Sequence, residues 1–205
     1  MSSEALKRYY RLHAPIYDAT RWAFLFGRRR LIQLLTTSRA GVVPKQILDL
    51  GCGTGKNLCA LAQAFPQAQI TGVDLSAAML AQAGRNLAQK LDPEARARIS
   101  LRNTDIALMP SLQYDLIVCS YMLSMTGTQL SDTLKKLRGL LTPTGRLAIV
   151  DFDTTQHRWF ARWMGVNHVR MDGQLAAQLQ KFSQVDLHEQ HSGLALWRWF
   201  IWIGR

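Results

Sequence analysis

Residues 47–57 read Ile-Leu-Asp-Leu-Gly-Cys-Gly-Thr-Gly-Lys-Asn, and this sequence is typical of a strand, a glycine turn and the start of a helix. An apolar run leads into Asp49, and the turn that follows contains three glycines, Gly51, Gly53 and Gly55. Because glycine has no Cβ, such a turn lets backbone N–H groups approach a ligand closely. The spacing is Gly-x-Gly-x-Gly, whereas the dinucleotide motif Gly-x-Gly-x-x-Gly would place its third glycine at Lys56. The carboxylate of Asp49 therefore favours a ligand with a positive amino group over a pyrophosphate.

A second carboxylate follows the next predicted strand, residues 69–73, about twenty residues after the turn. This residue, Asp74, is placed to hold the ribose hydroxyls of an adenosine. Together these motifs resemble the class I S-adenosylmethionine-dependent methyltransferases. The resemblance implies S-adenosylmethionine as cofactor and S-adenosylhomocysteine as product, with Asp49 and Gly51 at the methionine end and Asp74 at the ribose. The alternative is a glycine turn in another doubly wound fold.

Further cofactor contacts are expected beyond the carboxyl ends of the other strands, where ligands of open α/β sheets collect. The resemblance implies that Asp105 reads the adenine amino group beside Ile106, and that Tyr17 closes over the cofactor. The alternative roles are a turn or helix cap for Asp105 and ordinary core packing for Leu75 and Met79. The predicted cofactor-binding residues are Tyr17, Asp49, Gly51, Cys52, Gly53, Gly55, Asn57, Asp74, Leu75, Met79, Thr104, Asp105, Ile106 and Ser120.

The remaining sequence alternates strand and helix patterns, which predicts an α/β fold with right-handed crossovers. Strands are expected at 46–50, 69–73, 98–103, 115–120 and 146–151, and helices at 57–65, 77–90 and 130–141. We expect Pro93 to break the chain, residues 142–145 to form a turn, and 185–190 with 194–203 to form an antiparallel hairpin around Ser192 and Gly193. The expected fold is one Rossmann-like methyltransferase domain, residues 41–205, with a mostly parallel seven-stranded sheet. Helices at 2–13 and 16–38 are expected to precede it.

Length and composition bound the class of protein. The 205 residues suffice for one well-buried domain. No apolar run reaches the length of a bilayer span, and basic residues interrupt the N-terminus without a following apolar core, so we expect no secretory signal. The odd count of cysteines, with no metal-ligand spacing, indicates reduced thiols in a cytosol and predicts no metal site.

Positive charge concentrates in two segments of a chain whose net charge is +11. Residues 1–40 contain eight basic and two acidic side chains and so carry +6 of that charge, while residues 156–170 add three arginines and no acid. Such a field attracts polyanions, either nucleic acid or an anionic membrane surface. Because the polar share of residues 16–38 is nearly all arginine among aromatic and apolar side chains, residues 1–40 are expected to form an amphipathic helical lid that docks on a membrane.

Three side chains at strand ends are candidates for catalysis: Ser120, Tyr121 and Asp151. A hydroxyl there would orient an acceptor, and the face of Tyr121 would stabilise a methylammonium product. Asp151 would accept a hydrogen bond from an amine. The alternatives are a wall of the cofactor pocket for Tyr121 and a turn cap for Asp151. Methyl transfer to an amine needs little covalent help, because orientation and desolvation supply most of the acceleration.

The acceptor is best indicated by residues 10–22, Tyr-Arg-Leu-His-Ala-Pro-Ile-Tyr-Asp-Ala-Thr-Arg-Trp, followed by Phe26-Gly27-Arg28. Together with 48–57, 120–125, 150–152 and 167–169, this stretch resembles the small bacterial lipid N-methyltransferases. The BtaB-type enzymes, which make the betaine lipid diacylglyceryl-trimethylhomoserine, are nearest, and the PmtA-type phosphatidylethanolamine N-methyltransferases are next. The resemblance implies methylation of a lipid amino headgroup by a cytoplasmic protein that is peripheral on the inner face of the cytoplasmic membrane.

Such an enzyme must dock at an anionic membrane surface, where the headgroup lies. The predicted substrate and membrane contacts are Tyr10, Arg21, Trp22, Phe26, Arg28, Arg29, Arg30, Trp159, Trp163 and His168. The alternative is that these aromatics pack a lid helix onto the cofactor, with arginines on its solvated side. Other functions compatible with the sequence are a methyltransferase of another small molecule or of nucleic acid, and a non-enzymatic membrane-binding adaptor. We expect no nucleic-acid partner, because no recognition domain is appended, and the sequence implies no stable protein partner.

Overall fold

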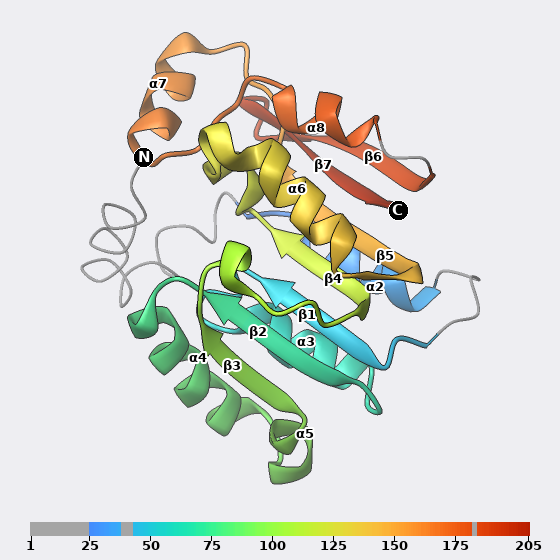
Figure 1. Ribbon diagram of the computed structural model, residues 1–205. Helices are drawn as coiled ribbons and strands as arrows, with labels where there is room; N and C mark the ends of the chain where they lie inside the picture. Colours follow the sequence, from blue (N-terminus) through green and yellow to red (C-terminus); the bar gives the residue numbers. More distant parts are fainter. Residues whose placement is uncertain (1–24, 38–42, 182–183) are drawn as a thin grey trace.

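The computed structural model describes residues 25–37, 43–181 and 184–205, which form one sheet covered by helices on both faces (Figure 1). The strands are β1 Gln46–Leu50, β2 Gln69–Asp74, β3 Ile99–Asn103, β4 Tyr114–Ser120, β5 Leu141–Phe152, β6 Val185–Gly193 and β7 Trp197–Gly204. Their order in the sheet is β3-β2-β1-β4-β5-β7-β6. Strands β1 to β5 are parallel, and β7 is antiparallel to both β5 and β6. The predicted mostly parallel seven-stranded sheet with a C-terminal antiparallel hairpin is confirmed.

Helices cover the two faces of the sheet, with α2 and α3 on one face and α6 and α8 on the other (Figure 1). The α-helices are α2 Arg28–Thr37, α3 Lys56–Ala64, α4 Ala77–Lys90, α5 Pro93–Ala97, α6 Leu130–Gly139, α7 Arg158–Val166 and α8 Gln174–Leu179. Short 3-10 helices are η1 Ile106–Leu108, η2 Leu123–Met125 and η3 Gly127–Gln129. Neither α7 nor α8 was expected from the sequence.

Alternation along the central strands divides the core into two layers. Ile47 of β1 packs with Leu58 of α3, whereas its neighbour Leu48 packs on the other face with Leu134 of α6. Because successive side chains of a strand point to opposite faces, a strand buried on both faces is apolar at every position. This explains the nearly continuous apolar run of β4, whose residues are buried apart from Asp115.

The N-terminal segment differs from the predicted helix over 16–38. Within the described residues, the helix begins at Arg28, and Gly27 before it has a φ of 81°. A Cβ at Gly27 would lie 2.2 Å from the ring of Trp199, so only glycine lets the backbone turn this close to β7. The predicted helix at 2–13, and the first part of the one at 16–38, lie outside the described residues.

Three local predictions are wrong for identifiable reasons. Pro93 starts helix α5 rather than breaking the chain, since proline is tolerated at the first helical position and Asp92 caps the helix by accepting a hydrogen bond from the N–H of Ala95. Residues 142–145 belong to β5, which begins with the pairing of Leu141 and Tyr114. The hairpin turns at Leu194 and Ala195, not at Ser192 and Gly193.

That hairpin turn is unusual in composition. Leu194 and Ala195 have φ values of 48° and 57°, and the N–H of Leu196 donates to the carbonyl of Gly193. Positive φ at both central residues is the type I′ geometry, which normally uses Asn and Gly. The sequence therefore carries no composition signal for this turn.

No helix among the described residues is long and apolar enough to cross a membrane.

Candidate active site

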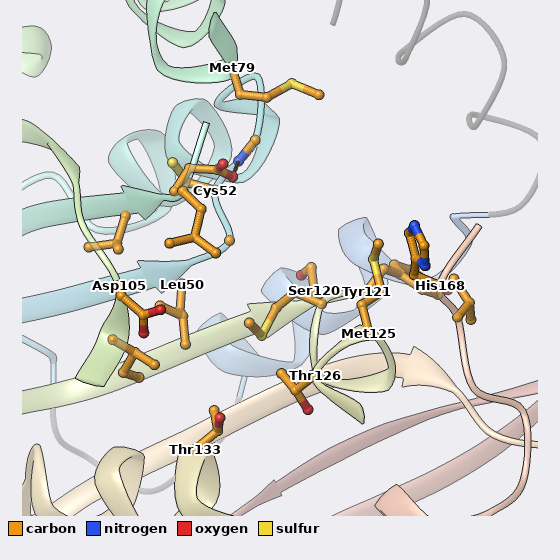
Figure 2. Close-up of a pocket in the computed structure, with 18 of the residues that line it drawn as sticks. Leu50, Cys52, Met79, Asp105, Ser120, Tyr121, Met125, Thr126, Thr133 and His168 are labelled. Atoms are coloured by element: carbon orange, nitrogen blue, oxygen red, sulfur yellow. Dashed lines mark hydrogen bonds between the residues drawn. The ribbon is translucent and has the colours of Figure 1, made fainter. Parts of the chain in front are cut away.

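A cavity of about 420 Å³ opens where β1, β2 and β4 end. Figure 2 shows Cys52, Met79 and Asp105 toward one end of it, and Tyr121, Met125 and His168 toward the other. The first end is built from the glycine turn and the segments after β2 and β3. The second is built from the loop after β4, from η2 and η3, and from the segment that follows α7.

Most predicted cofactor residues meet in this cavity. Those that line it are Gly51, Cys52, Gly53, Asn57, Asp74, Leu75, Met79, Thr104, Asp105, Ile106 and Ser120. Asp49 and Gly55 lie just outside the lining, while Tyr17 falls outside the described residues. Lining residues that were not predicted for the site are Leu50, Thr54, Lys56, Val73, Met122, Met125, Thr126, Gly127, Thr128, Gln129, Thr133, Gly165, Val169 and Arg170. Several of these directly follow β4. The rule that ligands bind beyond the carboxyl ends of strands would have found them if it had been applied to the ten residues after β4.

The glycine turn follows β1 with a left-handed backbone. Gly51 and Gly53 have φ values of 69° and 54°. A Cβ at Gly51 would lie 2.9 Å from the Cβ of Met122, so a side chain there would collide with the loop after β4. At Gly53 no atom lies within 4 Å of the Cβ position, and the residue faces the cavity. The turn therefore presents bare backbone to a ligand, as the sequence predicted.

Asp49, near the end of β1, is almost fully buried, with 1% of its surface exposed. Its Oδ1 lies 3.4 Å from Asn57 Nδ2, and its Oδ2 is buried without a hydrogen-bond partner among the described residues. Burial raises the pKa of Asp49 from 3.8 to about 7, although the hydrogen bond from Asn57 and the charge of Arg28 act in the opposite direction. An unpartnered buried carboxylate oxygen is the group that a ligand ammonium would satisfy.

Asp74 ends β2 on the opposite side of the glycine turn. Its Oδ2 accepts a hydrogen bond from the N–H of Gly53 at 2.9 Å, and its Oδ1 accepts one from the N–H of Ser76 at 2.8 Å. Burial raises the pKa of Asp74, and these backbone donors partly offset that rise. Each carboxylate oxygen has a second lone pair. The residue lines the cavity, so it is placed to accept hydrogen bonds from a ribose.

Asp105 caps the short helix η1, because its Oδ1 accepts a hydrogen bond from the N–H of Ala107 at 2.9 Å. This is the structural role weighed as an alternative from the sequence. Asp105 nonetheless lines the cavity beside Thr104 and Ile106, across from Met79, which is almost fully buried. An acid next to apolar walls at this end suits an adenine ring with an exocyclic amino group.

Tyr121 follows β4 in the left-handed region, with a φ of 57°. Its hydroxyl donates a hydrogen bond to the carbonyl of Phe26, and its ring packs on Phe152 with centroids 4.7 Å apart. Both Tyr121 and Ser120 line the cavity. The hydrogen bond to Phe26 shows that Tyr121 holds the N-terminal segment against the cavity. Its positive φ is a strained backbone conformation for a residue other than glycine.

Asp151 does not line the cavity, so it is not placed to accept the hydrogen bond that was predicted from an acceptor amine. The residue is fully buried, outside the cavity lining, and its carboxylate accepts three backbone hydrogen bonds. Oδ2 accepts from the N–H groups of Leu123 and Ser124 at 2.9 and 3.1 Å, and Oδ1 accepts from its neighbour Phe152 at 2.8 Å. Burial raises the pKa of Asp151 to about 6. Asp151 is therefore a positioning residue that fixes η2, one wall of the cavity, rather than a group that contacts an acceptor.

The predicted membrane contacts separate into different environments. Arg28 and His168 line the cavity. The three arginines at 28–30 do not act as one patch, because successive residues of a helix point about 100° apart. Arg30 pairs with Glu189 at 3.0 Å, and Arg29 is exposed.

The predicted aromatic contacts also differ among themselves. The ring of Phe26 stacks on Trp197, with centroids 5.9 Å apart, so it is partly used within the fold. Trp159 and Trp163 on α7 are 62% and 46% exposed. Tyr10, Arg21 and Trp22 fall outside the described residues.

Comparison with known proteins agrees with this architecture. A family model described as a methyltransferase domain matches residues 48–147. Malonyl-[acyl-carrier protein] O-methyltransferase of Halalkalibacterium halodurans is 31% identical over 159 residues, which cover 74% of this chain and 56% of that protein. The 2-phytyl-1,4-naphtoquinone methyltransferase of Trichormus variabilis is 31% identical over 157 residues, which cover 73% of this chain and 67% of that protein. This chain thus spans little more than half the length of the first relative.

A solved structure described as a DhpI-SAH complex has a TM-score of 0.69 at 20% identity, covering 99% of this chain and 96% of that one. This likeness shows the fold. Neither curated relative is named for a lipid amine, so the resemblance to lipid N-methyltransferases stays a prediction. The site fits S-adenosylmethionine: Asp49 suits its ammonium and Asp74 suits its ribose. The glycine turn between these two acids lets the cofactor approach the backbone closely. The chain therefore belongs to the class I S-adenosylmethionine-dependent methyltransferases.

Proposed function

We propose that this chain transfers the methyl group of S-adenosylmethionine to a small-molecule acceptor bound beside Tyr121. The observation that carries the proposal is the continuity of the cavity, which runs from Asp74 and Met79 to Tyr121 and His168. Its volume lies within the range of about 300–1,000 Å³ that is typical of small-molecule sites. The relatives named as methyltransferases support the reaction class.

The acceptor end is well suited to orient and dehydrate a small molecule. The bound cofactor supplies a methyl group on a sulfonium. Met122, Met125 and Val169 form apolar walls that exclude water from the reacting atoms. Thr126, Thr128, Gln129 and Thr133 supply hydroxyl and amide groups that hydrogen-bond an acceptor. Methyl transfer requires mainly that the acceptor lone pair is aligned with the methyl group and that water is excluded. Side chains that orient and dehydrate the acceptor are therefore sufficient for catalysis.

A lipid amino headgroup is a second candidate acceptor, and helix α7 favours it. Trp159, Trp163 and Val166 form an exposed apolar stripe at spacing i, i+4, i+7, flanked by Arg158 and Arg162. The buried side of the same helix is anchored by Phe160 and Met164. Since Gly165 and His168 line the cavity, a membrane that contacts this stripe would bring headgroups to the acceptor end.

This second candidate includes the partner and the location. The partner is an anionic surface such as the inner face of the cytoplasmic membrane, to which each nearby basic residue contributes about 1 kcal/mol. With the +11 net charge of the chain, several arginines would give reversible peripheral binding.

The acceptor class is tested by incubating the purified chain with methyl-labelled S-adenosylmethionine and a panel of acceptors. The panel contains anionic vesicles with phosphatidylethanolamine or diacylglyceryl-homoserine, a soluble dicarboxylic acid and a naphthoquinol. Label that passes into chloroform from the vesicles supports the lipid candidate, and label on a soluble acceptor supports the small-molecule class. Absence of transfer to every acceptor, by protein that binds the cofactor, would contradict the proposed activity.

Membrane contact through α7 is tested separately by flotation with anionic vesicles. We expect the wild type to float and the double variant Trp159→Ser, Trp163→Ser to remain in the bottom fraction. Leu108→Ser is the matched control, because Leu108 is 78% exposed on η1, away from α7. Equal flotation of both variants, or none by the wild type, removes the membrane from the account.

A further inference from the structure

Arg28 was predicted as a membrane contact, but it is partly buried and lines the cavity. It is the first residue of α2 and lines the cavity together with Gly51, Asn57 and Tyr121. Its guanidinium carbon lies 5.8 Å from the centroid of the Tyr121 ring. The close packing of Gly27 against Trp199 fixes the backbone just before it. The entry of this side chain into the cavity is thus built into the fold.

The guanidinium of Arg28 lacks an acidic hydrogen-bond partner among the described residues. Its Nε is buried there without any acceptor. Arg30, two residues later on the same helix, differs because it pairs with Glu189 of β6. A buried N–H without an acceptor is costly, so a position of this kind is kept where a ligand completes it.

Arg28, which lines the cavity, and Asp49, which lies just outside the lining, are side chains of opposite charge. Burial raises the pKa values of Asp49 and Tyr121, and the charge of Arg28 acts against that rise at both groups. Within the described part of the chain, the Nε of Arg28 and the Oδ2 of Asp49 have no hydrogen-bond partner. The N–H donor of Arg28 and the acceptor oxygen of Asp49 therefore both remain available to a ligand. An acid beside a base selects a zwitterion over a phosphate, which Asp49 and Asp74 would repel.

We propose that Arg28 binds the carboxylate of the amino-acid end of S-adenosylmethionine, while Asp49 binds its ammonium. A guanidinium presents a planar fork that matches a carboxylate in a bidentate manner, which a lysine does not. The proposal rests on the cofactor site described above and adds the residue that recognises its carboxylate. It also gives the N-terminal segment a defined task, since the cofactor then ties α2 to the ends of β1 and β4.

The test compares two cofactors that differ by one carboxylate. Affinities of S-adenosylmethionine and of decarboxylated S-adenosylmethionine are measured by calorimetry for the wild type, Arg28→Gln and Arg28→Lys. We expect Arg28→Gln to weaken binding of S-adenosylmethionine by roughly 10–100-fold and to leave binding of the decarboxylated compound within about twofold. Arg28→Lys, which keeps the charge but not the fork, should lie between the wild type and Arg28→Gln.

Two neighbours on the same helix serve as controls. Arg29→Gln removes an exposed charge and should change neither affinity, while Arg30→Gln breaks the pair with Glu189 and reports any loosening of α2. A purely structural role for Arg28 would lower both affinities equally, and an acceptor carboxylate as the true ligand would lower neither. Either result overturns the proposal. Because binding is measured without an acceptor, the result is independent of whether methyl transfer is found.

Discussion

The side-chain amide of Asn57 donates a hydrogen bond of 2.8 Å to the hydroxyl of Ser120, which ties the start of α3 to the end of β4. The same nitrogen lies 3.4 Å from Oδ1 of Asp49, at the end of β1. All three side chains are buried. Asn57 therefore holds the carboxylate of Asp49 in one orientation, with its other oxygen left for a ligand.

Replacing Asn57 with alanine should weaken binding of S-adenosylhomocysteine by roughly tenfold or more. A hydrogen bond to a charged group is worth about 1.5–3 kcal/mol, and about 1.4 kcal/mol corresponds to a tenfold change in affinity. Calorimetry measures the effect, and Ser120→Ala is the matched control. That variant removes only the acceptor hydroxyl and leaves Asn57 facing Asp49, so its loss should be smaller. Equal losses in the two variants would show that Asn57 does not act through Asp49.

Asp49 should make the folded protein less stable as the pH rises. Its pKa is about 7 in the folded chain against 3.8 ordinarily, so between these values the folded state binds more protons than the unfolded state. Stability contributed by the protonated acid is complete below about pH 4 and is lost as the pH rises toward 7. Asp49→Asn should therefore have a higher Tm than the wild type at pH 8, by about 2–4 °C for each kcal/mol relieved.

Thermal melts of the two proteins across the pH range measure this difference, which should shrink toward pH 4. A difference that stays constant with pH would mean that Asp49 does not titrate as its burial predicts. The same variant should bind S-adenosylhomocysteine poorly, because an amide does not balance an ammonium. Stability and binding are thus expected to change in opposite directions at this position.

Cofactor binding should release a proton from Asp49 in mildly acidic solution. The ligand ammonium favours the ionised carboxylate and so lowers its pKa from about 7. At pH 6 the free protein carries this proton and the complex does not, and affinity should fall as the pH drops below 7. Titrations at pH 6 in two buffers with different ionisation enthalpies give the number of protons released. Heats that are independent of the buffer would contradict an ionised Asp49 in the complex.

Asp151→Ala should destabilise the fold rather than affect chemistry selectively. The change leaves the N–H groups of Leu123, Ser124 and Phe152 without their acceptor, and each unsatisfied buried group costs about 1–3 kcal/mol. We expect a decrease in Tm of several degrees, with weaker acceptor binding because η2 is no longer fixed. A variant that melts like the wild type but no longer transfers methyl groups would restore the predicted contact between Asp151 and the acceptor.

Most residues predicted for the cofactor line one cavity because that part of the site depends on local sequence. The turn between β1 and α3 needs glycines, and Asp49 and Asp74 are fixed by their positions at strand ends, so a short motif carries the geometry. The strand pattern likewise carries the sheet, since strands buried on both faces read as apolar runs.

The acceptor end and the N-terminal segment were less predictable because they depend on tertiary contacts. Arg28, Arg29 and Arg30 are identical in type, and only the turn at Gly27 decides which of them enters the cavity. Asp151 reads as a strand-end acid, but the loop after β4 folds over it and donates two hydrogen bonds to its Oδ2, while the N–H of Phe152 donates to its Oδ1. Helix α7 has no acidic first turn and no side-chain cap, so its start carried no signal.

Whether Asp74 and the glycine turn hold the cofactor can be measured by titrating S-adenosylhomocysteine into the wild type and into Asp74→Ala. We expect one binding site in the wild type and roughly 10–100-fold weaker binding in the variant, because the ribose hydroxyls lose their buried acceptor. Asp132→Ala, an exposed acid on α6, should match the wild type. A wild type that binds no S-adenosylhomocysteine would show that the cavity is not a cofactor site, and unchanged affinity in Asp74→Ala would show that Asp74 does not hold the ribose.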